Sequence, residues 1–398
     1  MTDPLMNLYN RAPIAVASGE GVWLTDTGGR RYLDCVAGIA TDALGHAHPA
    51  LVAALTEQAG KLWHVSNIFR IPGQEALAQR LVDASFADCV FFANTGTEAV
   101  ECAIKTARRY HHVNGQPERI DIVGFAGSFH GRTYAAINAS GNAGYMEGCG
   151  PRLPGFVQLS VDDDAAIEEA IARPTTAAVI VEPVQGEGGA RALSSDWLLR
   201  LRALTRKHGV LLIHDEVQSG MGRTGRLFAH QWFDGAAPDI MALAKALGSG
   251  FPIGACLATT EAAKGMTPGV HGTTFGGNPL AMAVGIAAFD TIADEATLAN
   301  ARAASADFFD RLEELRGRFP DVIAEVRGKG LLIGLKMIPN NRAFMGVARD
   351  HGLLVAGGGE NCVRLLPSLL ITPAEVAEAV TRLESACVAA RGAMAQAA

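Results

Sequence analysis

The sequence lacks the patterns of a secreted, membrane-spanning or nucleic-acid-binding protein. Its seven cysteines are scattered without any CxxC pair, which indicates reduced thiols rather than a disulfide framework. No apolar run approaches the roughly 20 residues that cross a bilayer, and Met1 to Pro13 has no signal-peptide pattern. There is no basic block, and 34 Lys and Arg against 41 Asp and Glu give a net charge of −7. We therefore expect a soluble cytoplasmic protein with neither nucleic acid nor membrane as a partner.

Aromatic residues are also scarce, whereas the 45 glycines suit a sheet-and-helix enzyme with many tight turns. Short apolar runs at 120–125, 177–181 and 210–213 each lead into a polar loop, and helical segments alternate with them. This alternation predicts an α/β fold, with a mostly parallel sheet covered by helices. Ligands of such folds gather at the carboxyl ends of the strands.

The texture of the chain changes near residue 290. A long helical region is expected over 280–315, followed by strands at 323–327 and 331–336 within a smaller α+β lobe. The 398 residues are enough for a large domain and such a lobe.

Ionisable groups stand at three of the predicted strand ends. Lys245 follows the apolar run that begins after Asp239, and small residues with two glycines come directly after it. Partial desolvation there lowers the pKa of an amine and makes it nucleophilic, although a lysine at a strand end can also extend into solvent. Glu182 and Asp215 follow the strands at 177–181 and 210–213. Three such groups at one edge of a sheet favour a common site.

A predicted helix start lies at Asn94 to Ala99. Thr95 and Glu98 have the spacing of a capping box, and Gly96 allows a ligand to approach the backbone closely. The free N–H groups and positive dipole end of such a start suit a phosphate, although many capping boxes bind no ligand.

Two further patterns point to other chemistry. Gly220 to Gly225 matches GxGxxG, the nicotinamide-dinucleotide fingerprint, but it lies several residues past its strand and opens no obvious helix. His46 and His48 form an HxH pair of the kind found in metal sites, but no third ligand follows at suitable spacing. The alternative is a loop that leads into the helix expected at 49–60, and no metal is predicted.

The remaining candidates are consistent with one cofactor. Phe129 and Arg132 share a glycine-bounded loop, and Arg364 lies on an apolar strand, where it is either an edge residue or a carboxylate clamp. Metal ligands and a serine nucleophile elbow are both missing. Pyridoxal 5′-phosphate needs an amine for its aldehyde, a carboxylate for its ring nitrogen and N–H groups for its phosphate.

The motifs NTGTEA, FHGRT, EPVQGEGG, DEVQSGMGRTG and HGTTFGGNPLA, with the Lys245 segment, resemble the class III pyridoxal-phosphate-dependent aminotransferases across essentially the whole chain. Within that family they are most similar to the branch that acts on N2-acetylornithine. The resemblance implies a fold-type I homodimer with active sites at the dimer interface. It also implies a large PLP-binding domain over 60–290 and a small α+β domain formed by 1–59 and 291–398.

The resemblance assigns a cofactor-binding role to residues at matching motif positions. Lys245 matches the lysine that binds the cofactor covalently and moves the substrate proton, and Asp215 matches the partner of the ring nitrogen. Phe129 matches the aromatic residue that stacks on the ring. The others match polar contacts: Gln218 to the phenolic oxygen, Gly96 and Thr97 to the phosphate, and Thr274 to the phosphate of the neighbouring subunit.

The same resemblance implies the substrate contacts. Arg364 matches the clamp for the α-carboxylate of glutamate or 2-oxoglutarate, Glu187 the acid that masks this clamp, and Arg132 the contact to the carboxylate of the acylated diamino acid. Ile39 aligns with a tyrosine of enzymes that use free ornithine, so an apolar residue there favours an acylated amine. Thr41-Asp42 departs from the Val-Asn of many relatives, which puts the donor preference in doubt.

The expected reaction transfers the terminal amine of N2-acetylornithine to 2-oxoglutarate, as in arginine biosynthesis. The alternatives are a succinylornithine, succinyldiaminopimelate, 4-aminobutyrate or free-ornithine aminotransferase and, from a different class, an NAD-dependent oxidoreductase.

Overall fold

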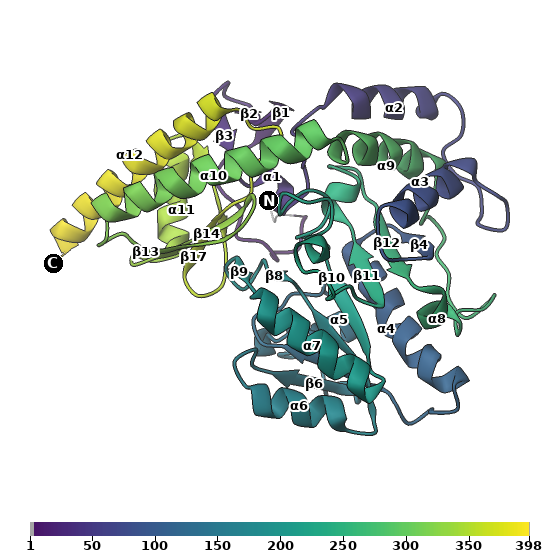
Figure 1. Ribbon diagram of the computed structural model, residues 1–398. Coiled ribbons are helices and arrows are strands. Elements are labelled where there is room, and N and C mark those ends of the chain that lie inside the picture. Colours follow the sequence, from purple (N-terminus) through teal and green to yellow (C-terminus); the bar gives the residue numbers. More distant parts are fainter. Residues whose placement is uncertain (1–3, 398) are drawn as a thin grey trace.

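The computed structural model describes residues 4–397, which form three main sheets and their covering helices (Figure 1). The strands are β1 Val16–Glu20, β2 Trp23–Asp26, β3 Arg31–Asp34, β4 Cys89–Ala93, β5 Asp121–Phe125, β6 Phe156–Leu159, β7 Thr176–Val181, β8 Val184–Gln185, β9 Arg191–Ala192, β10 Leu211–Asp215, β11 Ile240–Leu243, β12 Gly254–Ala258, β13 Ile323–Lys329, β14 Leu332–Met337, β15 Leu353–Leu354, β16 Ala356–Gly357 and β17 Cys362–Leu365. The helices are α1 Ala37–Ala40, α2 Pro49–Ala59, α3 Pro72–Asp83, α4 Gly96–Val113, α5 Tyr134–Ala139, α6 Asp164–Ala172, α7 Ser195–His208, α8 Thr260–Ala263, α9 Pro279–Ile292, α10 Glu295–Arg318, α11 Asn341–Asp350 and α12 Pro373–Ala397, with short 3-10 turns η1 Ala143–Tyr145, η2 Ala229–Trp232 and η3 Lys245–Leu247.

The central sheet has seven strands in the order β4-β12-β11-β10-β7-β5-β6. Only β12 runs against its neighbours, so the expected mostly parallel sheet is confirmed. The exception follows from the connection, because the segment between β11 and β12 holds only a 3-10 turn. A parallel return needs a crossover of a dozen or more residues.

Helices bury both faces of this sheet. In β7, Ala178 and Ile180 contribute to the core on one side with α4, whereas Val179 and Val181 contribute to the core on the other side with α6 and α7. Alternate residues of a strand point to opposite faces, so a strand covered on both sides must be apolar throughout. This explains the continuous apolar runs in the sequence.

Both ends of the chain meet in a second sheet of order β1-β2-β3-β15, where Leu353 and Leu354 of β15 pair in parallel with Leu33 and Asp34 of β3. The third sheet has the order β13-β14-β17-β16, and α10 and α12 lie side by side next to it (Figure 1). The helical region expected at 280–315 is two helices, α9 and α10. Asp294 interrupts it, because its carboxylate caps the start of α10 by accepting the N–H of Ala296.

No helix among residues 4–397 combines the length and the apolar character that a bilayer crossing needs.

Candidate active site

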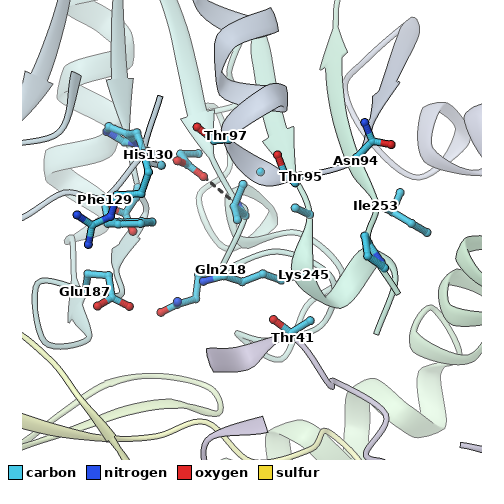
Figure 2. Close-up of a pocket in the computed structure, with 18 of the residues that line it drawn as sticks. Thr41, Asn94, Thr95, Thr97, Phe129, His130, Glu187, Gln218, Lys245 and Ile253 are labelled. Carbon is cyan, nitrogen blue, oxygen red and sulfur yellow. Dashed lines mark hydrogen bonds and ion pairs between the residues drawn. The ribbon is translucent and has the colours of Figure 1, made fainter. Parts of the chain in front are cut away.

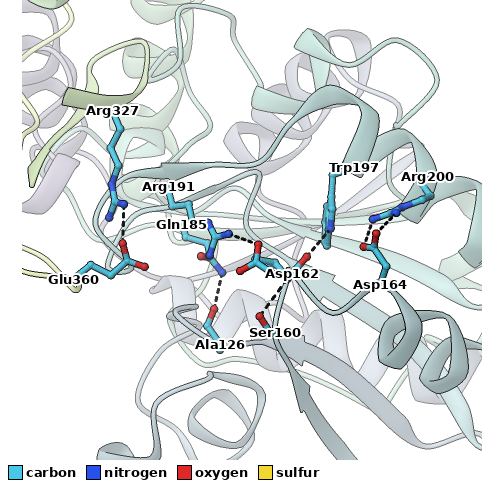
Figure 3. A network of polar contacts seen from close by, with 11 residues as sticks. Ala126, Ser160, Asp162, Asp164, Gln185, Arg191, Trp197, Arg200, Arg327 and Glu360 are labelled. Atoms are coloured by element: carbon cyan, nitrogen blue, oxygen red, sulfur yellow. Dashed lines mark hydrogen bonds and ion pairs between the residues drawn. The ribbon is translucent and has the colours of Figure 1, made fainter. Parts of the chain in front are cut away.

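A cavity of about 410 Å³ opens beside the carboxyl ends of the parallel strands (Figure 2). Eight of the eleven residues predicted to bind the cofactor or a substrate line it: Gly96, Thr97, Phe129, Arg132, Glu187, Asp215, Gln218 and Lys245. They come from segments up to about 150 positions apart in the chain, and the sheet brings them together.

Lys245 begins the 3-10 turn η3, two residues after β11 ends. Its backbone has a φ of +45°, a left-handed conformation that a non-glycine residue adopts only where the surrounding structure enforces it. Burial lowers the pKa of its amine to about 8, against the opposing charge of Glu187. The neutral, nucleophilic form of the amine is therefore far more populated near neutral pH than in an exposed lysine.

Asp215, the last residue of β10, is held in place by two hydrogen bonds. Its Oδ1 accepts the backbone N–H of Val217 at 3.0 Å, and its Oδ2 lies 2.8 Å from Nδ1 of His130. Both side chains are buried. Burial alone would lower the pKa of His130, but the hydrogen bond and charge of Asp215, with the charge of Glu182, raise it. Asp215 is thus a fixed carboxylate at the cavity wall.

Glu182 lies directly after β7 and holds the Phe129 loop. Its carboxylate accepts the backbone N–H groups of Phe129 at 2.8 Å and Gly186 at 3.1 Å. Burial raises the pKa of Glu182 to about 7, although the charge of His130 opposes this shift. Glu182 therefore fixes the position of the aromatic ring that faces the cavity.

The predicted capping box at the start of α4 is confirmed. Oγ1 of Thr95 accepts the N–H of Glu98 at 3.3 Å, and the Glu98 carboxylate accepts the N–H of Thr95 at 3.1 Å. The next amides, of Gly96 and Thr97, belong to the first turn, where no helical carbonyl reaches them. Gly96 and Thr97 line the cavity at this positive end of the helix dipole, an arrangement that suits a phosphate.

The predicted pairing of Arg364 with Glu187 is present. Nη2 of Arg364 lies 2.8 Å from Oε1 of Glu187, and Nη1 donates to Oε1 of Gln218 at 3.3 Å. Nε and Nη2 also donate to the carbonyl of Gly357. Arg364 is only 1% exposed, so an anion reaches its guanidinium only when Glu187 moves aside.

Three predicted site residues do not line the cavity of the single chain. Arg364 lies behind Glu187 and Gln218, as described above. Ile39 packs beside Val184 and Ala190, in a single left-handed turn over Ala37–Ala40 that leads to Thr41. Thr274 is in an exposed loop, next to Thr273, whose carbonyl accepts from Asn67. Of the motif Thr41-Asp42, Thr41 does line the cavity.

The sequence patterns that favoured other chemistry have structural roles. Gly220 to Gly225 forms turns, in which the buried guanidinium of Arg223 donates to the carbonyls of Leu331 and Pro367. Nε2 of His46 lies 2.8 Å from Oδ2 of Asp34, which ties the loop to β3.

Sequence reasoning gave no role to His130, which contacts Asp215, or to Tyr145, which contacts Arg132. His130 sits beside Phe129 in the recognised loop, so its position in that loop was the available signal. Tyr145 lies 13 residues beyond Arg132, at the end of the short 3-10 turn η1, and no periodicity in the sequence marks it.

Comparisons with known proteins define the family. The family model "Aminotransferase class-III" matches residues 6–387. Acetylornithine aminotransferase 2 of Caulobacter vibrioides is 66% identical over 97% of this chain and 96% of its own length. The crystal structure of N-acetylornithine aminotransferase from Stenotrophomonas maltophilia K279a has 40% identity and a TM-score of 0.85, covering 97% of this chain and 98% of that one. The ornithine aminotransferase of Toxoplasma gondii ME49 has 33% identity and a TM-score of 0.93, covering 98% and 93%.

The chain therefore belongs to the class III aminotransferases, and the predicted fold-type I architecture is confirmed. Enzymes of this family depend on pyridoxal 5′-phosphate, and the cavity fits that cofactor. It offers a partly neutral amine, a buried carboxylate, a phenyl ring and a helix N-terminus in one space. When bound, the cofactor supplies the electron sink that makes a substrate C–H bond acidic.

Proposed function

We propose that this enzyme moves the terminal amine of N2-acetylornithine to 2-oxoglutarate, giving N-acetylglutamate semialdehyde and glutamate in arginine biosynthesis. The observation that carries the proposal is the pair of arginines at the cavity, one masked and one open. Arg364 is buried and paired with Glu187, whereas Arg132 is exposed at the cavity wall. The names of the similar proteins support the same donor.

Two substrates that differ in carboxylate placement explain why one clamp is masked. 2-Oxoglutarate carries a carboxylate beside the reacting carbon, and Arg364 binds it when Glu187 swings away. The donor has no carboxylate beside its terminal amine, so Glu187 stays on Arg364 and leaves no buried cation unpaired. Arg132 then binds the distant carboxylate of the donor.

The chain's own residues divide the remaining work. Lys245 holds the cofactor and moves the proton at the reacting carbon, and Asp215 keeps a positive charge on the ring nitrogen. Phe129 would pack on the ring of the bound cofactor, Gln218 would contact its phenolic oxygen, and Gly96 and Thr97 would bind its phosphate. Ile39 disfavours a donor with a free α-ammonium group, because an apolar side chain offers no partner for that charge.

We also propose that the enzyme is a homodimer in which Thr274 of each subunit reaches the phosphate of the other. Four large apolar side chains are exposed on the single chain near Thr274. Phe275 follows Thr274 directly, and Trp63, Ile68 and Phe69 lie close in sequence to Asn67, which donates to the carbonyl of Thr273. His64 packs against Phe275, so the segment that carries Trp63 lies next to the loop of Thr274. Exposed apolar surface of this kind is typical of protein interfaces. The seven free cysteines support a reducing, cytoplasmic location.

The division into a large domain of 60–290 and a small domain of 1–59 with 291–398 is part of the same proposal. The pairing of β15 with β3, which joins the two chain ends, supports it.

A panel of donors tests the proposed reaction. Four amine donors are compared: N2-acetylornithine, N2-succinylornithine, free ornithine and 4-aminobutyrate. For each donor, the loss of visible absorbance measures the conversion of the bound cofactor to its amino form. We expect N2-acetylornithine to give the largest kcat/KM. A larger value for free ornithine would contradict both the proposed donor and the argument from Ile39.

The pKa of Lys245 makes a second prediction. Only the neutral amine attacks an aldehyde, so the rate at which the cofactor-free protein takes up PLP rises with pH through about 8 and then levels off. Visible absorbance after mixing measures this rate. A rise that continues to the ordinary lysine value near 10.5 would show that burial does not shift this amine.

A further inference from the structure

The guanidinium of Arg132 stacks on an aromatic side chain outside the cavity lining. Its Cζ lies 3.9 Å from the centre of the Tyr145 ring and 5.4 Å from that of Phe129. The two rings are 5.9 Å apart and nearly perpendicular, at 88°. Arg132 therefore rests against two rings, and the closer contact is to Tyr145, within the range of a cation–π interaction.

Arg132 is held differently from the other arginine of the site. Arg364 is fixed by Glu187, Gln218 and the carbonyl of Gly357. Within residues 4–397 no carboxylate forms an ion pair with Arg132. Ring contacts orient a planar guanidinium without occupying its N–H donors, so these remain available to a carboxylate.

The segment that carries Tyr145 is anchored on both sides. Oδ1 of Asn142 accepts the N–H of Gly144 at 3.0 Å and caps the 3-10 turn η1. Nδ2 of Asn138 contacts the sulfur of Met146 at 3.4 Å. The backbone that carries the Tyr145 ring is thus held by local contacts that do not involve Arg132.

We propose that Tyr145 is a positioning residue that determines specificity, because its ring holds Arg132 ready for a carboxylate remote from the reacting amine. The inference rests on the proposed role of Arg132 in binding the donor. It adds a residue that touches neither cofactor nor substrate and acts through the guanidinium. The substrate class it selects is an ω-amine with a carboxylate at the far end of a short chain.

A pair of donors isolates this effect. 5-Aminopentanoate carries the remote carboxylate, and pentylamine has a similar chain without it. For Tyr145→Leu we expect kcat/KM of the half-reaction with 5-aminopentanoate to fall about 5-fold, mainly through KM, as the loss of a cation–π contact predicts. The rate with pentylamine should stay unchanged. Tyr145→Phe keeps an aromatic face and should restore the wild-type value.

Tyr134→Leu is the matched control, since Tyr134 is an exposed tyrosine of the same region and should affect neither amine. Equal losses with both amines in Y145L would assign Tyr145 a general structural role, and no loss with either would show that the ring does not orient Arg132. Either result overturns the inference. If Y145L fails to fold, Tyr145→His provides a smaller aromatic face. A loss of rate confined to 5-aminopentanoate then supports the inference, and equal losses with both amines, or none, overturn it.

The comparison is independent of the acyl group. A wild-type enzyme that rejects N2-acetylornithine but uses 5-aminopentanoate contradicts the proposed function alone, because the contact of Tyr145 with Arg132 concerns only the remote carboxylate.

Discussion

Lys245→Ala is expected to lower transamination by roughly 10³-fold or more, because it removes both the attachment of the cofactor and the group that moves the substrate proton. The structure supports this size of effect, since Lys245 lines the cavity and burial lowers the pKa of its amine. Steady-state turnover and the visible absorbance of the purified enzyme with added PLP measure the loss.

Lys264→Ala is the control for Lys245→Ala. Lys264 forms an exposed ion pair with Glu261 at 2.8 Å, which contributes little to stability, and activity should not change. Added small primary amines should restore part of the proton transfer in K245A, because they can occupy the space that the side chain leaves. A K245A enzyme that keeps near-wild-type activity would show that another group carries the chemistry.

The fold and the location of the site were predictable because they depend on local patterns. Apolar runs such as that of β7 identify strands buried on both faces, and a parallel sheet then brings the residues after each strand to one edge. Lys245 and Asp215 were therefore expected near each other although 30 positions separate them. The capping box at Thr95 likewise follows from spacing alone.

The remaining features depend on contacts between distant segments. The antiparallel direction of β12 results from the short connection at η3, and the sequence of β12 itself resembles that of any buried strand. The hydrogen bond of His130 to Asp215 spans 85 positions, and Tyr145 contacts Arg132 from the short 3-10 turn η1. Tyr145 lies outside the motifs that carry the resemblance, and His130 lies within FHGRT, but the resemblance was used there only for Phe129 and Arg132.

The ion pair of Arg364 with Glu187 was predicted in part from the sequence and in part needed the structure. The pairing of Glu187 with Arg364 was predicted from the resemblance, and the structure shows which partner of the proposed clamp is free to move. Arg364 is buried, but the side chain of Glu187 is 33% exposed, so it can turn toward solvent at little cost. The buried partner stays fixed by Gly357 and Gln218, and the exposed partner moves.

Asp215 gives the second large prediction. Asp215→Ala is expected to lower kcat by about 10²-fold, since a fixed charge that stabilises the reacting state is lost from a buried position. Asp215→Asn tests whether the charge or the shape matters, because an amide can still accept the N–H of Val217 and contact His130. If the negative charge keeps the ring nitrogen cationic, the two variants lose similar activity, and the spectrum of the bound cofactor shifts in both.

Thermal stability distinguishes the structural role of the Asp215 carboxylate from its proposed electrostatic role. In D215A the buried imidazole of His130 loses its partner, which should lower the free energy of unfolding by about 1–3 kcal/mol, whereas D215N should lose less. Thermal unfolding of the two variants, with the exposed Asp234→Asn as control, measures the difference. A D215N enzyme with wild-type kcat would show that geometry alone suffices at this position. Such a result would remove the electrostatic basis for the assigned role of Asp215.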